Sequence, residues 1–423
     1  MLIFEGLPSS AVNSSFFYDE KRDISLKEGE LMDPAITTLC VLAVAAFLFV
    51  TELIPLAVTA MAACTALGIL GVLPSKQVYA GLSNSTVVLF GGMFVIGAAM
   101  FKTGLAEAVG LWVVNKAGTK EVPLMGAIMV VTIALSAVSS NTGTVACLMP
   151  VIVGIANAAH IPASKELMPL AVAANVGGTI TMIGTPPNVI VTGALSAAGL
   201  PSFGFFEFAL IGVPLSVIVL VYMLTIGRKT IPIKSAGAMD ADAVEAAKKE
   251  AGAGDDDAPK SKTKMWISGL ILLGVVAAMA LNLKTVPLQT AAVTGAILCV
   301  ITGCLKEKEA YAGIDWVTIF LFAGMLSVAT AMDKTGAGKL IADTVVGMMG
   351  DHPNPIVLCA VLYLISNVLT QFMSNTASAA LLAPIGISIA QSIGADPKPV
   401  LMSIGIAASM AFATPMATPP NTL

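Results

Sequence analysis

Formal charge is scarce in this sequence. Only 11% of its 423 residues are charged, with 22 Lys and Arg against 26 Asp and Glu, whereas 57% are hydrophobic. A typical soluble domain carries about 25% charged residues. The chain therefore has too little charge to cover a soluble surface, which argues against a water-soluble enzyme, a nucleic-acid-binding protein or a disordered scaffold. We predict that lipid is the solvent for most of it.

Groups that perform catalysis or hold transition metals are also sparse. There are two His, both in predicted loops, and six Cys, none of which forms a Cys-x-x-Cys pair. A zinc site would have few ligands. Inside the apolar runs we find no Ser/His, Asp/Asp or His-rich pairing and almost no formal charge, with Glu52 at the end of the first run. These absences argue against a membrane-embedded enzyme.

Apolar runs that are long enough, or nearly long enough, to cross a bilayer of ~30 Å recur along the chain. The first set lies at 35–53, 56–73, 86–101, 124–158, 166–198 and 205–227, and the second at 265–283, 287–304, 316–332, 355–391 and 397–423. Residues 1–34 are predicted to form a polar N-terminal tail, because their apolar start is too short for a signal peptide. Residues 228–264, rich in both charges, are predicted to form a charged cytoplasmic linker.

The two sets of runs are copies of each other. Leu89-Phe90-Gly91-Gly92-Met93 matches Leu321-Phe322-Ala323-Gly324-Met325 at an offset of 232 residues, Ser140-Asn141-Thr142 matches Ser374-Asn375-Thr376 at 234, and Thr185-Pro186-Pro187-Asn188 matches Thr418-Pro419-Pro420-Asn421 at 233. Matches this dense at nearly one offset indicate a duplication, with repeats at 35–227 and 265–423.

Each repeat contains one run that is polar in its middle. The runs are 124–158 and 355–391, and their polar centres are the Ser-Asn-Thr motifs. Because each apolar arm is shorter than the ~20 residues of a crossing helix, we predict re-entrant hairpins. Five true crossings per repeat are an odd number, so the second repeat is predicted to be inverted.

A second interruption in each repeat comes from paired prolines. Pro186-Pro187 and Pro419-Pro420 are expected to break the helices at 166–198 and 397–423, because proline removes a backbone donor and clashes with the preceding turn. The predicted fold is an all-α polytopic membrane protein. It has two inverted-topology repeats, each with a re-entrant hairpin and a broken transmembrane helix, and the second is expected to lack its final crossing.

The polar interruptions predict the chemistry of a binding site. Half-helix N-termini present unpaired N–H groups that favour an anion. Unwound carbonyls and the oxygens of Ser, Thr and Asn suit a hard cation such as Na⁺. A small anion could thus lie between two cations without a buried Arg, which membrane depth would penalise.

The doubled Ser-Asn-Thr and Thr-Pro-Pro-Asn motifs, together with Thr51-Glu52-Leu53-Ile54-Pro55-Leu56, resemble the divalent anion:sodium symporter family of dicarboxylate, citrate and sulfate carriers. The resemblance implies a homodimer that works by elevator-type alternating access, with Na⁺ as the coupling ion. It implies one sodium site at Ser136, Ser140, Asn141 and the backbone near Gly184, and a second at Thr370, Asn375 and the backbone near Met373 and Ala417. It implies substrate contacts from Ser140, Asn141, Thr142, Thr185, Ser374, Asn375, Thr376 and Thr418, with Pro186 and Pro419 shaping the breaks.

The predicted function is a secondary active transporter that carries a small dianion, a C4-dicarboxylate above all, together with Na⁺. Its expected partners are the dianionic substrate, the lipid bilayer and a second copy of the chain, but no nucleic acid. The expected location is the inner (plasma) membrane, as a multi-pass protein. The alternatives are a dicarboxylate or anion exchanger, a sulfate carrier without Na⁺ coupling, a proton-coupled carrier and an anion channel.

Overall fold

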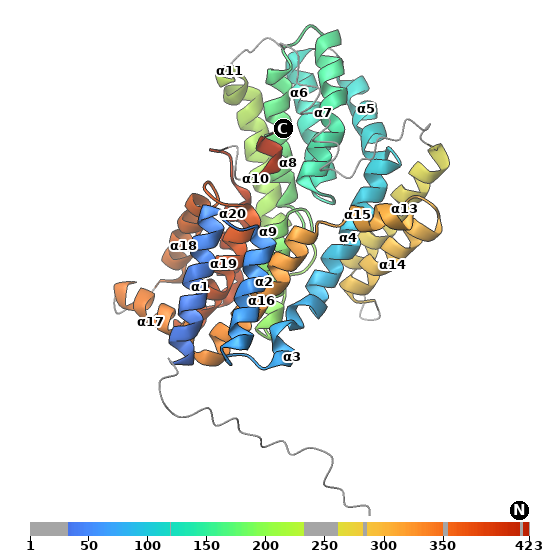
Figure 1. Cartoon of the computed structure of the whole chain (residues 1–423). Helices are drawn as coiled ribbons and strands as arrows, with labels where there is room; N and C mark the ends of the chain where they lie inside the picture. Colours follow the sequence, from blue (N-terminus) through green and yellow to red (C-terminus); the bar gives the residue numbers. More distant parts are fainter. Residues whose placement is uncertain are drawn as a thin grey trace, which may run out of the picture.

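The structure is a computed structural model that describes residues 33–118, 120–231, 261–281, 286–349, 354–414 and 418–422. Within these ranges every regular element is a helix, as predicted. Figure 1 shows the helices in one assembly, in which α4 crosses between the group at the top and the group at the lower left. Most of the predicted N-terminal tail and linker lies outside the described residues.

The helices of the first repeat follow the predicted runs closely. They are α1 (Pro34–Thr51), α2 (Leu56–Ile69), α3 (Ser75–Val78), η1 (Ala80–Ser83), α4 (Ser85–Lys102), α5 (Leu105–Ala117), α6 (Glu121–Ser136), α7 (Asn141–Ala158), α8 (Ser164–Gly178), α9 (Pro186–Ala197), α10 (Ala209–Tyr222), η2 (Met223–Gly227) and α11 (Arg228–Thr230). Local capping explains several boundaries. Asn84, for example, begins α4 by accepting a hydrogen bond from the Thr86 backbone N–H at 2.8 Å.

The second repeat contains a corresponding series of helices. Its helices are α13 (Lys262–Ala280), α14 (Leu288–Ile301), α15 (Glu307–Ala312), α16 (Trp316–Thr335), α17 (Ala337–Met349), α18 (Pro355–Leu369), α19 (Asn375–Ser392), α20 (Pro397–Ser409) and η3 (Pro419–Asn421). Gly336 ends α16 in the left-handed conformation, at φ 75°, which glycine adopts without steric cost.

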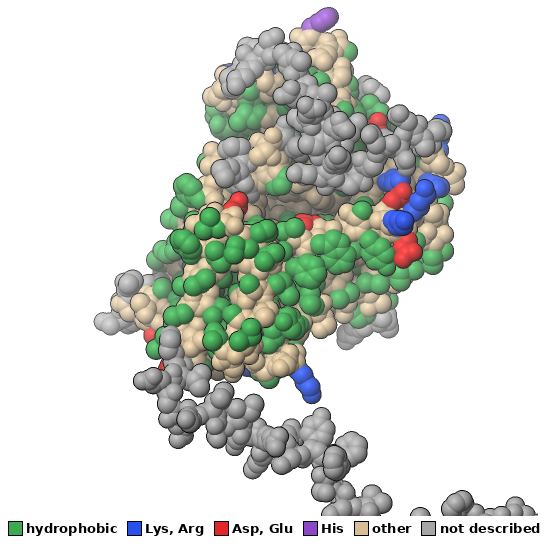
Figure 2. Space-filling model, in the orientation of Figure 1, with side chains coloured by type: hydrophobic (Ala, Val, Ile, Leu, Met, Phe, Trp, Pro, Cys, Tyr) green, Lys and Arg blue, Asp and Glu red, His purple; other side chains and the backbone are tan. Residues whose placement is uncertain are grey.

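The outer surface of this bundle is apolar. Among the described residues, six helices are long and apolar enough to cross a membrane, namely α1, α4, α7, the stretch Ala209–Thr230, α13 and α16. Large apolar side chains are exposed on them, with Phe47 60% exposed on α1, Leu210 75% on α10 and Leu273 66% on α13. Figure 2 shows such side chains gathered over the lower face. A soluble monomer rarely carries so large an apolar surface.

The long helices of the two repeats interlock at matching positions. A Cβ on Gly92 of α4 would lie 2.8 Å from the backbone of Ala292 in α14, and a Cβ on Gly324 of α16 would lie 2.7 Å from the backbone of Ala60 in α2. Both the glycines and the alanines are related by the offset of 232 residues. The duplication therefore extends to backbone contacts, since only glycine permits so close an approach at these two positions.

A lysine at the end of each long helix bridges to the other repeat. Lys102 of α4 bonds Glu309 of α15 at 2.5 Å, and Lys334 of α16 bonds Gln77 of α3 at 2.6 Å. These residues are again related by 232. The two bridges differ in charge, because only Glu309 carries a carboxylate.

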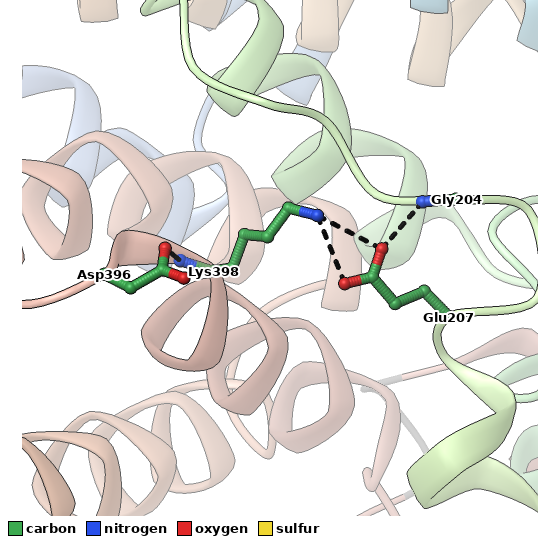
Figure 3. A network of polar contacts seen from close by, with 4 residues as sticks. All are labelled: Gly204, Glu207, Asp396 and Lys398. Carbon is green, nitrogen blue, oxygen red and sulfur yellow. Dashed lines mark hydrogen bonds and ion pairs between the residues drawn. The ribbon is translucent and has the colours of Figure 1, made fainter.

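Another ion pair joins the repeats near the start of α20. Lys398 donates to both carboxylate oxygens of Glu207 at 3.2 Å, and Glu207 accepts from the Gly204 backbone at 2.8 Å. Asp396 caps α20 by accepting from the Lys398 backbone N–H at 3.0 Å (Figure 3). The segment before α10 is thereby tied to the second repeat.

Candidate functional site

Both Ser-Asn-Thr motifs lie at the turn of a helix pair. Residues 137–140 separate α6 from α7, and residues 370–374 separate α18 from α19. Ser140 accepts from the Gly143 N–H at 3.4 Å, and Ser374 accepts from the Ala377 N–H at 3.2 Å. Serine is a strong N-cap, so each motif ends the turn and begins a helix. The helix pairs and their polar tips lie where the sequence predicts them, although the relation of each pair to a membrane stays a prediction.

The breaks at the Thr-Pro-Pro-Asn motifs are present, but proline has a different part from the one predicted. In the first repeat α8 ends at Gly178, the break covers 179–185, and Pro186 opens α9 as its first residue. Proline suits this position because it has no N–H to leave unpaired there. The helix is already interrupted by residues 179–185, before the prolines, and Pro186 and Pro187 begin the next helix rather than interrupt one.

The two breaks are held by the same hydrogen bond. Asn188 Nδ2 donates to the Thr181 carbonyl at 2.9 Å, and Asn421 Nδ2 donates to the Thr414 carbonyl at 3.2 Å. Both donors and both acceptors are related by 233 residues. The asparagine of the motif therefore fixes the irregular backbone seven residues before it.

All four motifs line one cavity of about 660 Å³. The residues predicted to bind substrate or Na⁺ that line it are Ser140, Asn141, Thr142, Gly184, Thr185, Pro186, Ser374, Asn375, Thr376, Thr418 and Pro419. The lining also includes Phe90, Phe94 and Phe101 of α4, and Thr318 of α16. The structure thus brings together segments more than two hundred residues apart in the chain.

Four other predicted residues lie just behind this lining or outside the described residues. Ser136, Thr370 and Met373 are buried, with exposed fractions of 0%, 0% and 1%. Ala417 lies outside the described residues.

Three oxygen atoms converge behind each Ser-Asn-Thr tip. Ser136 Oγ lies 2.6 Å from Asn141 Oδ1 and 2.7 Å from the Ala174 carbonyl oxygen. Thr370 Oγ1 lies 2.7 Å from Asn375 Oδ1 and 2.8 Å from the Ala408 carbonyl oxygen. The offset of 234 relates each atom to its counterpart. We call these groups the first and second oxygen clusters.

Glycine makes the first cluster possible. A Cβ on Gly178 would lie 2.5 Å from Asn141 Oδ1 and 3.0 Å from the Gly184 carbonyl oxygen. The two oxygens therefore face the bare Cα of Gly178, and any side chain would displace one of them.

The sequence analysis missed two buried polar residues of the same bundle. Asn175 is fully buried in α8 and donates from Nδ2 to Asn421 Oδ1 at 3.0 Å. Glu166, in the first turn of α8, is also fully buried, and neither carboxylate oxygen has a partner among the described residues. In the sequence, each of these residues is a single Asn or Glu within or at the start of an apolar run, and this was the signal that could have found it. The buried Glu166 also shows that carboxyl side chains are less completely excluded from the interior than predicted.

The exposed apolar helices and the cavity that the four motifs line are typical of a multi-pass membrane protein that binds a solute. Comparison with known proteins identifies the class. Residues 46–397 match the model of the citrate transporter family, CitMHS. The chain belongs to this family of transporters.

Individual relatives agree with this assignment. An uncharacterized transporter of Haemophilus influenzae is 29% identical, over 91% of this chain and 84% of its own length. The sodium-dependent dicarboxylate transporter SdcS of Staphylococcus saprophyticus is 27% identical, over 93% and 80%. The sodium-dependent high-affinity dicarboxylate transporter 3 of Caenorhabditis elegans is 26% identical, over 91% and 76%.

A solved structure supports the fold alone. The YdaH transporter of Alcanivorax borkumensis, described as having an unusual topology, aligns with a TM-score of 0.55 and 13% identity, over 91% of this chain and 89% of that chain. Family and fold together confirm a multi-pass transporter of the plasma membrane, not an enzyme, consistent with the divalent anion:sodium symporters that the sequence resembles.

Proposed function

We propose that this chain carries a small dianion, a C4-dicarboxylate above all, across the membrane together with Na⁺. The observation that supports this proposal most directly is the cavity, because both Ser-Asn-Thr tips and both Thr-Pro-Pro-Asn breaks line it. Relatives named sodium-dependent dicarboxylate transporters point the same way.

Helix N-termini supply the attraction for the anion. Ser140 caps α7, Ser374 caps α19 and Thr185 caps α9, and all three caps line the cavity. Each N-terminus carries roughly half a positive charge, and α7 and α19 also present backbone N–H groups that can bind an oxyanion, whereas the first two residues of α9 are prolines and have none. Substrate carboxylates would accept from these groups and from the side chains of Asn141, Thr142, Asn375 and Thr376, with Thr418, Pro186 and Pro419 shaping the ends.

The oxygen clusters supply ligands for the cation. In each cluster one hydroxyl hydrogen lies within reach of two acceptor oxygens and can point to only one of them at a time. A hard cation can take all three oxygens of a cluster as ligands. The proposed first site includes Ser136, Ser140, Asn141 and the Gly184 carbonyl. The second includes Thr370, Asn375 and the backbone near Met373 and Ala417.

The family resemblance also implies a homodimer and elevator-type alternating access. The cavity is compatible with such movement, because it is lined by α4 and α16 as well as by the helix-pair tips and the breaks. We include both features in the proposal.

The coupling ion is tested by uptake of radiolabelled succinate into proteoliposomes. We expect uptake to require an inward Na⁺ gradient and to ignore a pH gradient of the same size. Uptake driven by pH alone would instead support a proton-coupled carrier, and counterflow without Na⁺ would support an exchanger. Either result would contradict the proposed coupling.

The residue assignment is tested by Asn141→Ala and Asn375→Ala. Each removes an oxygen from one cluster, so we expect Na⁺-dependent uptake to fall at least about tenfold while the amount in the membrane is unchanged. Asn157→Ala is the matched control, because Asn157 is exposed on α7. Wild-type uptake in both site variants would overturn the assignment.

A further inference from the structure

An amide bridge joins the two repeats directly behind the cavity. Asn175 Nδ2 of α8 donates to Asn421 Oδ1 of the second Thr-Pro-Pro-Asn motif at 3.0 Å. Asn421 uses its own Nδ2 within the second repeat, toward the carbonyls of Ala411 at 2.5 Å and Thr414 at 3.2 Å. The bridge therefore links α8 of the first repeat to the residue that holds the second break.

The chemistry of the partners fixes the orientation of both amides. Because Asn421 Nδ2 faces two carbonyl oxygens, its Oδ1 must face Asn175, and Asn175 must then present its Nδ2. This orientation leaves Asn175 Oδ1 buried without a partner among the described residues. An unpaired buried oxygen costs about 1–3 kcal/mol, so the bridge is kept at a cost that needs an explanation.

Asn175 is also adjacent to the first oxygen cluster. The preceding residue, Ala174, provides the carbonyl oxygen that lies 2.7 Å from Ser136 Oγ. One turn of α8 thus contacts the first cluster through its backbone and the second break through a side chain.

The mirror position has no such bridge. The offset of 234 relates Asn175 to Ser409, whose hydroxyl donates to the Gly405 carbonyl of its own helix at 3.0 Å. Asn188 Oδ1 lies near α20, since a Cβ on Gly405 would be 3.5 Å from it. This oxygen has no partner among the residues that the structure describes. Of these two related positions, therefore, only Asn175 forms a side-chain hydrogen bond to the other repeat among the described residues.

We infer that Asn175 is a positioning residue that couples the two cation half-sites, an inference that rests on the proposed function. A cation held by Ser136 Oγ and Asn141 Oδ1 turns the single Ser136 hydrogen away from itself, toward the Ala174 carbonyl. That hydrogen bond fixes the turn of α8 that carries Asn175. Asn175 then holds Asn421, whose Nδ2 binds the Ala411 and Thr414 carbonyls of the second break. Binding at the first half-site thus favours binding at the second, which is positive cooperativity.

The dependence of succinate uptake on Na⁺ concentration tests this coupling. We expect a Hill coefficient of about 2 in the wild-type protein and about 1 in Asn175→Leu, with Na⁺ half-saturation raised about fivefold. The maximal rate at saturating Na⁺ should stay within about twofold, because Asn175 does not line the cavity. A second variant, Asn175→Ser, removes the bridge by shortening the side chain and should show the same fall in the Hill coefficient. Asn157→Ala is the control.

A double-mutant cycle separates coupling from packing. In an Asn421→Ala background, Asn175→Leu should change the Hill coefficient no further, because the bridge is already broken. A wild-type Hill coefficient in both Asn175 variants, or a full additional effect in the Asn421→Ala background, would overturn the role of Asn175 alone. A wild-type protein whose uptake ignores Na⁺ would overturn the proposed function together with this coupling.

Discussion

The proposed binding residues carry no formal charge. Behind each tip a hydroxyl oxygen, an Asn oxygen and a backbone carbonyl meet, and in the first cluster the Asn oxygen also faces the bare Cα of Gly178. Dipoles that are already oriented by caps and breaks can bind both an anion and a cation, without the cost of a charged side chain inside the membrane.

Gly178 gives a prediction at this scale. In Gly178→Ala the new Cβ would lie 2.5 Å from Asn141 Oδ1, so the first oxygen cluster must open. We expect Na⁺-dependent uptake to fall by at least about tenfold, because a displacement of one ångström costs this much in a positioned site.

Gly154→Ala is the matched control, since nothing lies within 4 Å of a Cβ at that position in α7. Uptake and surface expression are measured together for both variants. Normal uptake by Gly178→Ala would show that the first oxygen cluster does not bind the coupling ion.

Repetition decided which of these residues could be predicted. The family resemblance implied Ser136 and Thr370, and the offset of 234 that they share with the Ser-Asn-Thr motifs supports them as a pair. Asn175 escaped prediction because its counterpart is Ser409, and a lone amide in an apolar run has no repeated signal. The Ala174 and Ala408 carbonyls could not be predicted, because any residue supplies a carbonyl and only the tertiary structure selects two of them.

At the scale of elements, the ends of helices form most of the proposed site. The apolar runs and their polar centres predicted the helix pairs, the turns between them and the broken helices. The part of proline was predicted wrongly, since a Pro pair can either disrupt a helix or begin one. The glycines at the end of α8 did not predict that the helix ends there, because glycine also occurs inside close-packed helices.

The bridge between α4 and α15 predicts a dependence of stability on pH. Desolvation alone would raise the pKa of Glu309, but hydrogen bonds from Lys102 and the Lys306 backbone, with the charges of both lysines, lower it overall. A lowered folded pKa means that the stabilisation is present above the ordinary value of 4.5 and is lost as pH falls through the lowered value.

Glu309→Gln removes this contribution, which is about 1 kcal/mol or less for a partly exposed pair. We expect the melting temperature of the variant in detergent to lie below that of the wild type at pH 7, and the two to converge as the pH falls through the lowered pKa of Glu309. Gln77→Glu should create the same acid-sensitive difference at Lys334. A gap between wild type and Glu309→Gln that persists at low pH would contradict the ion pair.

At the scale of the whole molecule, composition was enough to predict the environment. The excess of apolar residues appears as exposed side chains on α1, α10 and α13, and the match to a transporter family agrees with it. The meeting of four motifs in one cavity was expected from duplication, whereas the aromatic wall of α4 was not. Nothing in an apolar run indicates which of its faces will line a cavity and which will face lipid.

The central claim is that a dianion and Na⁺ bind together between the two tips, and equilibrium binding tests it most directly. Calorimetric titration of the purified protein with succinate should give binding in Na⁺ and none in choline. Succinate should also raise the affinity for Na⁺ by the same factor, since linkage is reciprocal. Asn141→Ala with Asn375→Ala should abolish binding in Na⁺. Equal succinate affinity in Na⁺ and choline would contradict the claim.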